Sequence, residues 1–86
     1  MPELSRFYGI HITMYADDHN PPHFHAEYNG EEVLFDIVDG VFMKGNLPSK
    51  QARLVLAWYE LHKDELIENW NNLSSGKNFF KINPLS

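Results

Sequence analysis

The chain has 86 residues, 43% of them hydrophobic and 14% aromatic, with a formal net charge of −5. This length supports one hydrophobic core, so we expect a single domain over residues 1–86. The lack of cysteine excludes disulfides, thiolate metal ligands and a cysteine nucleophile. No apolar run approaches the roughly 20 residues of a membrane span, and no leader peptide follows Met1, so we expect a cytoplasmic protein.

The first half of the chain has the pattern of an antiparallel sheet. Alternating side chains predict a strand over about 6–16, which ends in the proline-containing segment 17–22. Three more strands are predicted at about 23–28, 31–38 and 41–45. The dipeptides Asn29-Gly30 and Asp39-Gly40 are typical of two-residue hairpins, so about four strands should form one meander.

A two-residue loop at Asn29-Gly30 would set the register of the central hairpin and therefore its two faces. The face that should meet the helical half then carries the apolar pairs Ala26–Val33 and Phe24–Phe35. The other face carries Glu27 opposite Glu32, His25 opposite Leu34 and His23 opposite Asp36. The second hairpin should add Met43 opposite Asp36 on this polar face.

The second half of the chain predicts helix. Residues 49–75 are rich in helix formers with an apolar stripe at helical spacing, and Gly76 is a plausible stop. An unbroken helix of this length would measure about 40 Å, longer than a domain with a radius of gyration near 12 Å. We therefore expect one long helix bent near His62-Lys63-Asp64, or two short ones, on one face of the sheet. Residues 77–86 should form an arm or a last strand, which completes an α+β domain.

Two apolar segments suggest an interface. Residues 54–59 are apolar on nearly all sides, and Phe79-Phe80 lies in the tail, so a homodimer or a heteromeric contact is expected. Residues 26–43 carry five acidic residues and no basic one, which describes either a solvated surface or an edge that meets a basic partner. The overall acidity argues against broad DNA binding, which relies on phosphate neutralisation.

Three of the five histidines, His19, His23 and His25, fall within seven residues. On a strand, His23 and His25 share one face, while His19 would approach from the proline-stiffened loop. Neutral imidazoles at this spacing can bind a divalent transition metal, with Asp36 as the leading oxygen ligand and Asp17 or Glu27 as alternatives. The spacing does not closely match a common zinc or dioxygenase motif.

Two other interpretations of the histidines remain open. The imidazoles could act as general acid and base without a metal. With the cation Arg6, and with His11, the catalytic set His19, His23 and His25 would suit RNA cleavage. Alternatively, the rings satisfy backbone groups of the loop and pack against their aromatic neighbours.

Three segments, Ser5–Ile10, Asp18–Tyr28 and Glu65–Trp70, resemble the small bacterial family of domain of unknown function 4160. The similarity covers nearly the whole chain, and the His-Asn-Pro-Pro-His-Phe-His stretch is its most specific part. Genes of this family often neighbour those of domain of unknown function 2442. Such pairs are regarded as type II toxin–antitoxin modules with this family as the toxin, and some members are labelled transcriptional regulators.

The resemblance implies a biological role and a partner but no reaction. It implies a toxin-like component held by a small cognate protein of the domain of unknown function 2442 type, with RNA as a candidate substrate. The alternative from another class is a non-catalytic binding module or transcriptional regulator that acts through the same partner. A small metalloprotein is the third hypothesis.

Overall fold

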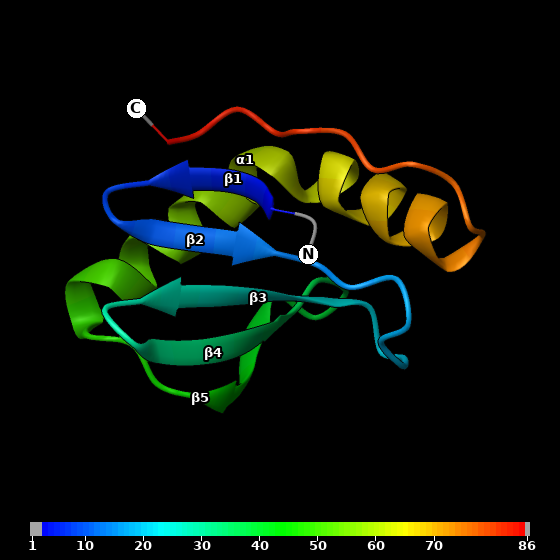
Figure 1. Cartoon of the computed structure of the whole chain (residues 1–86). Helices are drawn as coiled ribbons and strands as arrows, with labels where there is room; N and C mark the ends of the chain where they lie inside the picture. Colours follow the sequence, from blue (N-terminus) through cyan, green and yellow to red (C-terminus); the bar gives the residue numbers. More distant parts are fainter. Residues whose placement is uncertain (1–2, 86) are drawn as a thin grey trace.

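The computed structural model describes residues 3–85 of the chain, so Met1, Pro2 and Ser86 lie outside the described part. Five strands form one antiparallel sheet in the order β1-β2-β3-β4-β5, and a single helix lies across one face of it (Figure 1). This confirms the α+β class and the meander. The elements are β1 Glu3–Phe7, β2 Ile10–Thr13, β3 His23–Tyr28, β4 Glu31–Asp36, β5 Val41–Gly45 and α1 Ser49–Ser74.

The single strand expected over 6–16 is wrong, because the chain reverses inside it. Tyr8 and Gly9 both have positive φ, 49° and 78°, and separate β1 from β2 as a tight hairpin in which Phe7 pairs with Ile10. Positive φ at both central residues matches the twist of the flanking strands, and Gly9 adopts it at no steric cost. The predicted period of two is confirmed for Ile10, Ile12 and Met14, because all three side chains are buried.

The central hairpin has the predicted register. Asn29 and Gly30 have positive φ, 55° and 86°, and β3 pairs with β4 from Tyr28–Glu31 to His23–Asp36. The apolar face is buried against the helix, as predicted. Its four side chains are at most 1% exposed: Phe24, Ala26, Val33 and Phe35.

The second hairpin differs from the prediction. Asp36 pairs with Val41 rather than Met43, so residues 37–40 form a four-residue loop instead of a two-residue turn at Asp39-Gly40. The Asp36 carboxylate accepts a hydrogen bond from the Asp39 backbone N–H at 2.9 Å, which stabilises the longer turn. A β-bulge then shifts the register, so Leu34 pairs with Lys44 while Phe35 pairs with Phe42.

The predicted break in the helix lies at His62. Its φ and ψ of −126° and 20° are not helical, and the two segments of α1 meet there at a kink. The radius of gyration is 11.7 Å, close to the expected 12 Å. The apolar stripe of the first segment enters the core, where Trp58 packs on Phe7 and Phe24 and the Tyr59 hydroxyl donates to the Ile37 carbonyl oxygen.

The helix stops just before Gly76, as predicted. The Lys77 N–H donates to the Asn72 carbonyl and the Gly76 N–H to the Leu73 carbonyl, and Gly76 has φ of 76°, which together form a Schellman cap. The tail then runs back as an arm rather than a strand as far as residue 85, past α1 and along β1 (Figure 1). The Ile82 N–H donates to the Leu4 carbonyl at 2.8 Å, so the arm covers the β1 edge of the sheet.

The two segments expected at an interface are largely used within the chain. Val55, Trp58 and Tyr59 are buried in the core, and Phe79 and Phe80 are half-buried against it. Leu56 stays exposed on the outer side of the helix. Within residues 3–85, no helix combines the length and the apolar character that crossing a membrane requires.

Candidate metal centre

Three side chains from two neighbouring segments converge at one end of β3. Asp18 belongs to the loop between β2 and β3, and His23 and His25 are the first and third residues of β3. One ligand atom from each of them lies within 4.8 Å of the other two. The Asp18 Oδ2 atom is 3.1 Å from Nε2 of His23 and 3.0 Å from Nε2 of His25. One carboxylate oxygen therefore faces two imidazole nitrogens.

The His23 ring is held on its other side by the backbone. Its Nδ1 lies 2.8 Å from the Pro21 carbonyl oxygen. A carbonyl only accepts, so Nδ1 carries the proton, and in the neutral ring Nε2 is left as a free ligand atom. The indole of Trp70 packs on this ring at a centroid distance of 5.3 Å, and His23 is only 6% exposed. The orientation and tautomer of His23 therefore already suit a metal on the Asp18 side.

The His25 ring is held between the loop and the sheet. Its edge meets Tyr15 in a T-shaped contact at 4.7 Å, and its Nε2 contacts Asp18. The opposite nitrogen, Nδ1, is buried without a hydrogen-bond partner among the described residues. The nearest acid to it is Glu32, whose Oε2 lies 3.6 Å away, beyond hydrogen-bonding distance.

The two contacts of the Asp18 Oδ2 atom are compatible with a shared metal ion, and they are also ordinary hydrogen-bond distances. Metal bonds of about 2.0–2.2 Å place neighbouring ligand atoms roughly 3.0–3.4 Å apart in octahedral or tetrahedral sites. The two measured distances from Asp18 Oδ2 agree with this range. Two imidazole nitrogens with one carboxylate suit zinc, iron, nickel or copper, whereas calcium and magnesium prefer ligand sets made of oxygen. Asp18, His23 and His25 could thus hold a divalent transition metal.

The group differs from the predicted ligand set in two members. Among residues 3–85, His19 is exposed and lies outside the group. Asp36 pairs with His23 across the strands as expected, but its carboxylate accepts a hydrogen bond from the Asp39 N–H and is not part of the group. The sequence did not predict Asp18 as a member of this group. Its place in the same loop as His19 was a signal, but spacing does not tell which loop side chain turns back toward β3.

Arg6 and His11 belong to a separate cluster. Both contact Glu3 Oε2, at 3.1 Å and 3.0 Å, so the structure does not bring Arg6 to His23 and His25. Partial burial raises the pKa of the Glu3 carboxyl, but hydrogen bonds and charge from Arg6 and His11 outweigh it, and the pKa is lowered below its ordinary 4.5.

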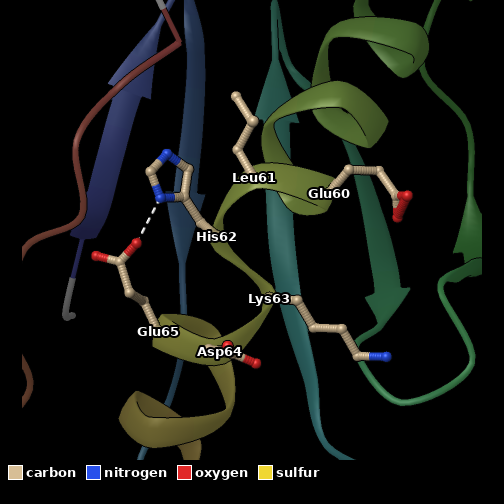
Figure 2. Close-up of a pocket in the computed structure, with 6 residues that line it drawn as sticks. All are labelled: Glu60, Leu61, His62, Lys63, Asp64 and Glu65. Atoms are coloured by element: carbon tan, nitrogen blue, oxygen red, sulfur yellow. Dashed lines mark hydrogen bonds and ion pairs between the residues drawn. The ribbon is translucent and has the colours of Figure 1, made fainter.

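A hollow of the described surface lies elsewhere, at the helix kink. It measures about 420 Å³ and is lined by residues 60–65. Figure 2 shows His62 and Glu65 turned toward each other on one side of the kink, with Glu60 and Lys63 on the other. The His62 ring also packs on Trp58 at 5.4 Å. His62 is therefore a residue of the helix break, as predicted, and the hollow follows from the bend of one helix.

Comparison with curated proteins and with solved structures finds no match. A family model does match, described as Domain of unknown function (DUF4160), over residues 9–71. This range covers well over half of the chain and includes Asp18, His23 and His25. The chain therefore belongs to this family of domains of unknown function.

Proposed function

We propose that this protein binds a divalent transition metal through Asp18, His23 and His25. The observation that carries the proposal is the convergence of their ligand atoms within 4.8 Å on one carboxylate oxygen. If the partners of this carboxylate were guanidinium groups, the three side chains would form an ordinary ion-pair network. Here, both partners of the acid are imidazoles, which are the commonest protein ligands of such metals.

The composition of the group favours an open site. Structural zinc sites use four protein ligands, whereas catalytic zinc and non-haem iron(II) sites use three and leave positions for water or substrate. The bound metal would supply an activated water and a Lewis acid at the mouth of the loop. The chain itself supplies two imidazoles and a carboxylate, with Tyr15 packed on His25 and Trp70 packed on His23.

Metal titration tests the proposal directly. The purified protein, stripped with a chelator, is titrated with zinc, iron(II) and nickel, and metal content is measured by plasma mass spectrometry. One equivalent should bind, and His25→Gln or His23→Gln should abolish stoichiometric binding. His19→Ala, an exposed histidine of the same loop, should bind as the wild type does. A wild type without stoichiometric metal would overturn the proposal.

RNA cleavage belongs to this proposal only in a metal-assisted form. Arg6 forms an ion pair with Glu3. A bound metal would therefore have to bind the phosphate, which is the role that the sequence predicted for Arg6. Cleavage of a labelled RNA that depends on added metal and is lost in His25→Gln would support it. Cleavage that persists in the presence of chelator would contradict it.

A second proposal concerns a protein partner, and a surface feature favours it. Around β5, the side chains of Val38, Val41, Phe42 and Met43 are between 39% and 54% exposed. The surrounding segment 26–43 has acidic residues and no basic one. Exposed apolar side chains in and beside an acidic segment suit an apolar and basic segment of a small cognate protein.

The partner proposal is tested with the product of a neighbouring small gene. Co-expression should allow the two proteins to purify together, and Val41→Lys should disrupt the complex. Leu61→Lys, at a more exposed apolar site on the helix, is the control that should leave it intact. Growth arrest on expression alone, relieved by the partner, would support the toxin-like role. A complex that is insensitive to Val41→Lys would contradict this surface.

A further inference from the structure

Glu32 is an acidic side chain close to His25 that the three-ligand group leaves unused. It lies on β4, and its Oε2 faces the Nδ1 atom of His25 at 3.6 Å. Asp18 contacts the other ring nitrogen, Nε2, so the two acids lie on opposite sides of one imidazole. Glu32 is therefore placed behind the ligand rather than beside the metal.

The hydrogen bonds of the His25 ring are mismatched without a metal. When neutral His25 donates its Nε2–H to Asp18, Nδ1 becomes an acceptor. This acceptor is buried and has no hydrogen-bond partner among the described residues, and the Glu32 carboxylate 3.6 Å away is also an acceptor. A buried polar atom without a partner costs free energy, so this tautomer is a poor match to its surroundings.

Metal binding would remove the mismatch. Ligation through Nε2 displaces its proton to solvent, and Nδ1 takes one from solvent, so the ring stays neutral and Nδ1 becomes a donor. The Glu32 carboxylate is then the matching acceptor. Its side chain is half exposed and has room to close the remaining distance.

From this geometry we propose that Glu32 is a positioning residue of the metal centre, which holds His25 in the tautomer that presents Nε2 to the metal. The inference rests on the proposed metal function and adds a residue that does not touch the ion. The alternative role of Glu32 is an ordinary exposed strand residue. Glu27, which pairs directly with it across β3 and β4, carries the same charge and is exposed. Glu27 is therefore a matched control.

The experiment is a zinc titration of the full chain with a competing chelator. Glu32→Ala should weaken zinc binding about 10–100-fold, the usual effect of removing the partner of a ligating histidine. Glu32→Gln should lie between Glu32→Ala and wild type, because its amide oxygen still accepts the Nδ1–H without the charge. Glu27→Ala should bind as the wild type does, which controls for the general loss of negative charge.

Nitrogen-15 NMR of the His25 ring provides a readout that a merely structural role would not change. In the zinc-loaded wild type, Nε2 should show the shift of a ligated nitrogen and Nδ1 that of a protonated one. In Glu32→Ala, the Nδ1 proton should exchange faster with water. Ligation through Nδ1, or unchanged affinity in Glu32→Ala, would overturn the inference while leaving the metal site intact. Absence of zinc binding by the wild type would overturn both.

Discussion

Two clusters on the same sheet combine one carboxylate with two basic side chains, yet they differ in what they can do. Glu3 contacts Arg6 and His11 on the outer side of β1 and β2, while Asp18 contacts His23 and His25 at the end of β3. One of the two partners of Glu3 is a guanidinium, which is a cation and not a metal ligand. Asp18 has two imidazoles, which can bind a metal ion in place of a proton. The first cluster is a surface ion pair and the second is a candidate metal centre.

The largest expected effect comes from removing the central carboxylate. Asp18→Asn keeps the size of the side chain but removes its charge, so zinc affinity should fall by more than about 100-fold, beyond the effect usual for an indirect contact. Glu3→Gln makes the same change in the other cluster and should leave zinc affinity unchanged. Competition titration measures both, and equal affinities for Asp18→Asn and wild type would contradict the distinction between the two clusters.

The next effect is stabilisation of the fold by metal. Free zinc at about 100 times its dissociation constant should add about 2.7 kcal/mol to the unfolding free energy. For a domain of this size, this corresponds to an increase of roughly 10–20 °C in Tm. Calorimetry with and without a chelator measures it, and His25→Gln should lose the shift. An identical Tm with and without zinc would contradict binding to the folded state.

The Glu3 cluster should appear in the pH dependence instead. Because the pKa of Glu3 is lowered in the folded state, its contribution to stability is present above pH 4.5 and is lost as the pH falls through the folded pKa. The unfolding free energies of wild type and Glu3→Gln should therefore differ at neutral pH and converge in acid. Urea unfolding between pH 3 and 7 measures this. Glu31→Gln, at an exposed strand end, controls for the loss of one surface carboxylate.

The smallest effect is expected for Arg6. Its side chain is 61% exposed, so the ion pair with Glu3 is well solvated. Arg6→Ala should lower the unfolding free energy by about 0.2–1 kcal/mol, and less at high salt. It should also leave zinc binding unchanged. A large loss of zinc affinity in Arg6→Ala would contradict the separation of the two clusters. It would support the predicted role of Arg6 in the same site as the histidines.

The sequence by itself determined the features that depend on neighbours in the chain. The central hairpin followed from Asn29-Gly30, because only residues that tolerate positive φ make this turn, and a period of two then assigned its faces. The pairing of His23 and His25 on one strand came from the same periodicity. The helix break at His62 followed from length, since a straight helix would have exceeded the domain.

Only the tertiary structure decided which side chains from the loop meet these strands. The hairpin at Tyr8-Gly9 was missed because a tyrosine rarely adopts positive φ, and a single glycine within a strand pattern does not distinguish a turn from a bulge. Asp18 rather than His19 faces the histidines, because the loop turns the Asp18 side chain back toward β3 and leaves His19 exposed. Residues distant in sequence fix such positions through packing, which local spacing does not encode.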